Sequence, residues 1–192
     1  PDMKNSIKKI KGYIVVVFAV LLYATSIVYA QPIKLVKGES ILIDGVYYSD
    51  INIEFSFSRA YLQALNSGLV FDIDLDFLIV NVKPWRVDKE IGQLSQTYTI
   101  KYNAFTQRYT VLNTNTGREI SYPTIETTLR NLGTINKFPV VDDSLINIDE
   151  NYQVFLSANI KAQGVPQWIK TLTFWRDNLD FQTEQIQWPL FK

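Results

Sequence analysis

Three aspartates at a spacing of two, Asp72, Asp74 and Asp76, are the side chains best arranged for chemistry in this chain of 192 residues. In a β-strand this spacing puts all three carboxylates on one face. The pattern is similar to the start of a calcium-binding loop, but such a loop needs Gly at its sixth position and Glu at its twelfth. Here those positions are Phe77 and Lys83. The outer two aspartates would also lie about 13 Å apart, too far for ligands at roughly 2.4 Å from one ion. We expect a solvated acidic face, and a cation site is the alternative.

Asp74 and Asp76 would lie about 6.6 Å apart along a strand, within the roughly 5 to 9.5 Å that separates the two carboxylates of a glycosidase. The chain has no histidine and no cysteine, which removes the commonest general base, the Ser-His and Cys-His nucleophiles and a structural zinc site. It also has no glycine-rich phosphate-binding motif. We therefore predict no catalytic residue and no cofactor. A carboxylate-only hydrolase or a cation-dependent carbohydrate-binding module, resting on these aspartates and Trp85, is the alternative.

A second group of residues combines aromatic rings with arginine. Tyr, Trp and Arg are the residues that most often anchor protein interfaces. Cross-strand packing explains tyrosines that alternate along a strand, but Trp85 and Phe105 fall outside the alternating runs. We predict an interaction surface made of Trp85, Arg86, Tyr102, Asn103, Phe105, Arg108 and Tyr109.

Alternating apolar residues predict the strands that position these groups. Asp44-Gly45 lies between the apolar runs 41–43 and 46–48, which is a strong signal for a tight hairpin. Alternation continues over 51–57, and the longest strand is predicted from Leu69 to Val82, with its aspartates opposite an apolar face. Further alternating segments lie at 98–102, 109–111, 152–160, 168–174 and 186–188.

Two short helices separate these strands. Ser58 is a suitable N-cap for the first helix, and Gly68 is a suitable residue to end it. Thr124 and Gly133 are the corresponding residues of the second helix. Many short strands with two helical connections predict a mainly β fold, an antiparallel β-sandwich with two short connecting helices. A curved single sheet covered by the helices is the alternative.

The first thirty residues have the features of an export signal. Four lysines precede an apolar run over 13–28, which is followed by Ala30 at the position that signal peptidase reads. Cleavage there would release 31–192 as a single β-rich domain into the periplasm, and we interpret Pro1-Asp2, before the only methionine, as a scar. The run is shorter than the roughly 20 residues of a bilayer span. This length favours cleavage over the alternative, an inner-membrane anchor through 13–28.

Residues 31–192 hold 15 basic and 18 acidic residues, which gives no reason to expect nucleic acid as a partner. Contact with a membrane is expected only through the signal segment, if it is uncleaved. No Pro/Gly-rich linker and no internal repeat divides this part of the chain. Because it contains no cysteine, the expected exported domain must be stable without disulfides.

The segment 96–109, taken with Trp85-Arg86, resembles the signature of the proteobacterial exported proteins grouped as domain of unknown function family 4390. In those proteins a strand ends in Tyr-Asn-Ala-Leu-Thr or a close variant, where this chain has 102–106 with Phe105 in place of leucine. The resemblance covers the early hairpin, both helices and the tryptophan-containing end. It implies no established catalytic residue or cofactor. It also implies an envelope signalling partner, since genes of the family often lie beside sensor kinases.

We therefore expect a non-catalytic periplasmic binding or interaction domain, with an envelope protein as its partner and association with a membrane sensor kinase as the implied setting. The first alternative is the hydrolase or carbohydrate-binding module described above. The second is a structural envelope protein with no small-molecule site.

Export can be tested directly. Expressed from Met3 in a Gram-negative host, the chain should be recovered from the periplasm with Gln31 as its first residue, because the signal would be cleaved after Ala30. N-terminal sequencing of the fractionated cells checks this. Recovery of the protein in the membrane fraction with Met3 intact would instead establish the anchor.

Overall fold

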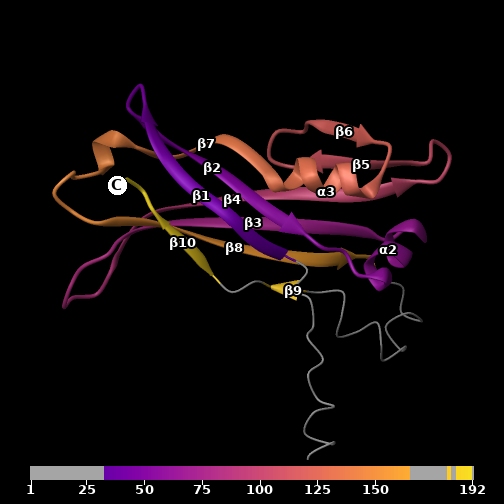
Figure 1. Cartoon of the computed structure of the whole chain (residues 1–192), viewed down its shortest axis with the longest axis horizontal. Coiled ribbons are helices and arrows are strands. Elements are labelled where there is room, and N and C mark those ends of the chain that lie inside the picture. Colours follow the sequence, from indigo (N-terminus) through magenta and orange to yellow (C-terminus); the bar gives the residue numbers. More distant parts are fainter. Residues whose placement is uncertain (1–32, 165–180, 183–184, 192) are drawn as a thin grey trace, which may run out of the picture. The chain divides into compact units, whose positions relative to one another are not determined.

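The computed structural model describes residues 33–164, 181–182 and 185–191. The predicted export signal and the alternating segment 168–174 lie outside these residues. Within them, no helix is both long and apolar enough to span a bilayer. The described chain forms two antiparallel sheets and two short α-helices (Figure 1).

The smaller sheet has three strands in the order β1-β2-β7, with β1 at Ile33–Ile43, β2 at Val46–Phe55 and β7 at Thr134–Asp142. Asp44 and Gly45 join β1 to β2, and both have positive φ, 48° and 81°. A two-residue connection of this kind matches the twist of the strands it joins. The predicted Asp-Gly hairpin is therefore confirmed.

The larger sheet is centred on β3 (Val70–Asn81), which pairs with β4 (Lys89–Asn103) on one side and β8 (Tyr152–Gln163) on the other. It continues beyond β4 through β5 (Arg108–Asn113) and β6 (Glu119–Tyr122). The outer edge of β8 pairs with two short strands, β9 (Phe181–Gln182) and β10 (Ile186–Pro189).

Both predicted helices are present with the predicted caps. In α2 (Arg59–Asn66) the Ser58 hydroxyl accepts a hydrogen bond from the Tyr61 N–H at 3.4 Å, and in α3 (Ile125–Gly133) the Thr124 hydroxyl accepts one from the Thr127 N–H at 3.2 Å. These bonds satisfy N–H groups that have no partner in the first turn of a helix. A single 3-10 turn, η1 (Asp143–Leu145), follows β7.

The two sheets pack face to face, which confirms the sandwich. The alternating apolar residues of β3 are fully buried, and those of β2 face them across the core. The rings of Phe77 on β3 and Phe138 on β7 stack with centroids 4.6 Å apart. The residues of this inner layer are Ile51, Ile53, Phe55, Phe71, Ile73, Leu75, Phe77 and Ile79.

Trp188 closes one side of the sandwich by joining β10 to β1. Its indole N–H donates to the Ser40 hydroxyl at 3.0 Å, and Ser40 in turn bonds the buried Ser49 hydroxyl at 2.7 Å. A Cβ at Gly38 would come within 2.6 Å of the Trp188 ring. Glycine is therefore required at 38 for the ring to lie flat against β1.

The sequence does not predict β6, β7 or the first part of β4. In β7, alternation is interrupted by Lys137, whose φ is +51°, and by Pro139, and the pairing with β2 shifts register nearby. Both features are typical of edge strands, which avoid open pairing in this way. Alternation of apolar and polar residues therefore does not predict a strand at 134–142.

Gly133 ends α3 as predicted, but for a reason that the sequence does not show. Its φ is not positive; instead a Cβ at this position would lie 1.9 Å from the Ile53 carbonyl oxygen on β2. Gly133 therefore permits close approach of the helix backbone to the strand.

Gly133→Ala should lower the free energy of unfolding by at least about 2 kcal/mol, because helix and strand must separate to admit the methyl group. Gly92→Ala is the matched control: no atom lies within 4 Å of its added Cβ, so the change should stay within about 0.5 kcal/mol. Urea denaturation of the purified variants checks both values. Equal stability of the two variants would contradict the close approach.

Candidate functional site

The three aspartates of β3 lie on the outer face of the larger sheet, half-buried, as the alternation predicts. Each accepts a hydrogen bond from the hydroxyl that faces it on β4. Thr99 donates to Asp72 over 2.7 Å, Thr97 to Asp74 over 2.8 Å and Ser95 to Asp76 over 2.7 Å. The acidic face is thus paired across the strands.

β8 supplies further partners to the same face. The Lys161 ammonium lies 3.1 Å from Asp74, and Gln163 donates to Asp72. Among the described residues, no three Asp, Glu, His or Cys side chains are grouped so that they could hold a metal ion. The observed role of this face is to tie β3 to its two neighbours.

The β4–β5 turn is shaped by Asn103. Its side-chain oxygen accepts hydrogen bonds from the backbone N–H groups of Phe105 and Thr106, at 3.0 and 3.1 Å. Such local bonds are why Asn favours turns. Phe105, at the tip, is fully exposed.

The other predicted residues of this turn are bonded within the domain. The rings of Tyr102 and Tyr109 pack across the strands with centroids 4.9 Å apart, and the Tyr109 hydroxyl donates to Asn66 at 3.0 Å. Partial burial raises the pKa of Tyr109. The Arg108 guanidinium donates to the Ser121 carbonyl at 2.8 Å. These side chains hold β5 to β4, β6 and α2, and Phe105 alone projects freely.

Trp85 and Arg86 lie far from that turn. They form the β3–β4 connection, at the opposite end of β4, whose 15 residues span about 45 Å. Trp85 is fully exposed and has a φ of +67°. The structure therefore brings five of the predicted residues together around Phe105 and separates Trp85 and Arg86 from them.

Trp85 belongs to a different group, which we call the loop end and define as residues 41–46, 83–88 and 142–151. Figure 1 shows these three connections at one end of the described domain, with the β4–β5 turn at the other. Six of the nine large hydrophobic side chains that are exposed in the described residues lie here. They are Ile41, Leu42, Trp85, Val87, Leu145 and Ile148.

The three connections are held together by bonds among themselves. The Asp143 N–H donates to the Gly45 carbonyl, and the Val82 N–H donates to the Asn151 carbonyl, both at 2.8 Å. Lys83 forms an ion pair with Glu150. The bases of the three connections are therefore joined to one another.

Glu150 fixes the base of the longest of these three connections. Its carboxylate accepts hydrogen bonds from Lys83, Asn81 and, at 3.0 Å, the Tyr152 hydroxyl. The Lys83 ammonium, helped by these other donors, holds the pKa of Glu150 below its ordinary value. A charged Glu150 thus anchors the segment that presents Ile148.

A groove of about 690 Å³ crosses the loop end between β1 and the end of the described chain. Its walls are mainly apolar and include Ile41, Leu42, Ile148 and Phe191. The Phe191 ring packs at its back against Tyr47 and Tyr152, with centroid distances of 6.0 and 6.2 Å. Burial, followed by the nearby Asp143 carboxylate, raises the pKa of Tyr47.

Charge at the loop end is predominantly negative. Its three segments contain six acidic residues and two basic ones. Clusters of exposed apolar groups mark interaction sites, and at the loop end these groups are interspersed with carboxylates along the chain.

Sequence reasoning found Trp85 but missed Leu145 and Ile148. Trp85 and Phe105 were singled out as large apolar residues outside any alternating pattern. Leu145 and Ile148 show the same signal, because they lie in a segment rich in Asp, Asn and Ser that does not alternate. Their grouping with Trp85 depends on the topology and could not be read from spacing.

These features define an antiparallel β-sandwich domain with one apolar, acidic end. The chain belongs to the family described as Domain of unknown function (DUF4390), whose model matches residues 30–189. The resemblance carried by Trp85-Arg86 and 96–109 is thus confirmed. No curated protein and no solved structure matches the chain.

Phe105→Ala should change the free energy of unfolding by no more than about 0.5 kcal/mol, because the exposed ring buries little area on folding. Phe77→Ala, in the core, should cost about 3 to 5 kcal/mol. Chemical denaturation of the two purified variants provides the comparison. A loss of about 3 kcal/mol from Phe105→Ala would show that the turn is part of the core.

Proposed function

We propose that this protein is an exported, non-catalytic binding domain that docks a protein partner at its loop end. The observation that carries the proposal is the concentration of exposed apolar side chains there. Exposing such groups in water is unfavourable, and contiguous patches of them are typical of surfaces that bind.

The charge of the loop end favours a particular kind of partner. Six carboxylates against two cations would attract a basic surface and repel the anionic headgroups of a membrane. The partner is therefore a protein that presents apolar side chains flanked by Lys or Arg. Trp85 and Ile148 are large, strongly exposed side chains that can enter pockets of such a partner.

The loop end is also prepared for binding in its unbound state. The Lys83–Glu150 pair and the backbone bonds at Gly45 and Asn151 hold its three segments in place. A surface that is ordered before binding loses less conformational entropy when the partner arrives. The β4–β5 turn is ordered as well, but Phe105 is its one exposed large apolar side chain among the described residues, and this difference supports the loop end.

The cellular setting follows from the export signal and the family resemblance. The signal supports a periplasmic location, and the resemblance supports an envelope protein as the partner, with the outer part of a membrane sensor kinase as the first to test. The missing histidine and cysteine support a domain that binds without catalysing a reaction.

Site-specific photocrosslinking in cells tests the proposal. A photoreactive residue at position 85 or 148 should give one adduct of defined mass, and the same residue at position 105 should give none. Position 105 is the matched control, because Phe105 is as exposed as Trp85 but lies at the other end of β4. An adduct from 105 alone, or none from any position, would contradict the proposal.

The partner identified by mass spectrometry should then bind the purified domain. Trp85→Ala and Ile148→Ala should each weaken binding about tenfold or more, since anchors of this kind contribute about 2 kcal/mol. Stability should change by no more than about 0.5 kcal/mol, because both side chains are exposed. Binding should also weaken as salt is raised. Equal affinity of wild type and both variants would show that the partner contacts another surface.

A further inference from the structure

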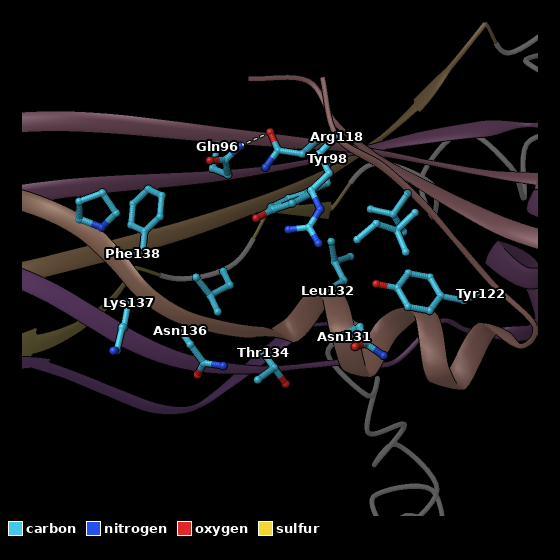
Figure 2. Close-up of a pocket in the computed structure, with 15 residues that line it drawn as sticks. Gln96, Tyr98, Arg118, Tyr122, Asn131, Leu132, Thr134, Asn136, Lys137 and Phe138 are labelled. Carbon is cyan, nitrogen blue, oxygen red and sulfur yellow. Dashed lines mark hydrogen bonds between the residues drawn. The ribbon is translucent and has the colours of Figure 1, made fainter. Parts of the chain in front are cut away.

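The larger sheet is wider than the smaller one, and the inner face of its strands β4, β5 and β6 extends beyond β7. α3 covers part of this face. The rest forms a cleft of about 360 Å³ between β4–β6 on one side and α3 and β7 on the other (Figure 2). This is within the size range of small-molecule sites.

The cleft is lined by apolar and aromatic side chains together with uncharged polar ones, which are Gln96, Asn113, Asn131, Thr134 and Asn136. Val111 and Leu132 are buried, Ile120 is partly exposed, and the rings of Tyr98 and Phe138 line it. Burial raises the pKa of Tyr98, although a hydrogen bond with Asn113 acts in the opposite direction. The phenol is therefore neutral near pH 7 and contributes no negative charge.

Charge in the cleft is positive only. Among the described residues that line it, Arg118 and Lys137 are charged and none is acidic. Figure 2 shows the Arg118 guanidinium directed into the cleft beside the Tyr98 ring, whereas Lys137 points away from that ring. Within the described chain, no ion pair or side-chain hydrogen bond engages this guanidinium.

The backbone that presents Arg118 is fixed. The Asn113 N–H donates to the Arg118 carbonyl and the Gly117 N–H to the Asn113 carbonyl, both at 2.8 Å, and Gly117 has a φ of +71°. Gln96, beneath this turn, donates to Asn113 and Asn115 at 2.8 and 2.9 Å. The backbone from which the exposed Arg118 side chain extends is thus ordered at the edge of the cleft.

We propose that this cleft binds a carboxylate carried on an apolar group, with Arg118 holding the carboxylate and Val111, Ile120 and Leu132 contacting the apolar group. Arg pairs with carboxylates through two parallel N–H···O bonds. An apolar group without the anion would form no bond to the guanidinium. The source of the carboxylate is either a free organic acid or the C-terminus of a peptide.

NMR titration of the purified domain with octanoate and with octanol is the test. Octanoate should shift the amide signals of Tyr98, Val111 and Leu132 with a dissociation constant of about 1 mM or tighter, and octanol should bind at least tenfold more weakly. Arg118→Gln should reduce octanoate affinity at least tenfold and leave octanol unaffected. The octanoate affinity of Arg118→Lys should lie between those of the wild type and Arg118→Gln, because lysine keeps the charge but lacks the planar pair of N–H donors. Arg86→Gln, on the β3–β4 connection, is the matched control and should bind as the wild type does.

A tetrapeptide ending in Phe-Leu separates the two sources. If the tetrapeptide acid binds more tightly than both its amide and octanoate, the source is a peptide C-terminus. If octanoate binds more tightly than the tetrapeptide acid, the source is a free organic acid. Equal binding of octanoate and octanol, unchanged binding by Arg118→Gln, or no shift with any probe would overturn the proposal. None of these outcomes depends on the loop end, whose variants should bind octanoate normally.

Discussion

Burial of one face of β3 is the constraint on which the rest of the structure depends. Its five alternating apolar side chains, from Phe71 to Ile79, are fully buried, and each contributes roughly 1.5 to 3 kcal/mol by leaving water. Because side chains alternate along a strand, burying this face turns the three aspartates outward. There they accept hydrogen bonds from hydroxyls on β4. The acidic cluster is thus a consequence of the core.

The unequal width of the two sheets determines where binding surfaces can form. Three strands cover the centre of the larger sheet, Trp188 closes one side, and α3 fills part of the other. Close packing of α3 on β2 requires Gly133. What this helix leaves uncovered is the cleft beside Arg118.

The sequence predicts those parts of the fold that follow from local pattern. The Asp44-Gly45 turn, the caps at Ser58 and Thr124 and the faces of β3 need only a few neighbouring residues, and all are confirmed. β7 could not be predicted, since its bulge at Lys137 and Pro139 reflects its position at a sheet edge. The same limit applies to the candidate sites. Exposure of Trp85 and Phe105 could be predicted from broken alternation, but their separation by the full length of β4, and the grouping of Trp85 with Ile148, come from topology.

The central claim is that a partner binds the loop end while the core around β3 stays unchanged. Amide hydrogen exchange of the domain, with and without the crosslinked partner's purified binding region, measures this most directly. The account predicts added protection confined to 41–46, 83–88 and 142–151, with the exchange of β3 unaltered. Protection centred on Phe105, or distributed over β3 and β8, would contradict it.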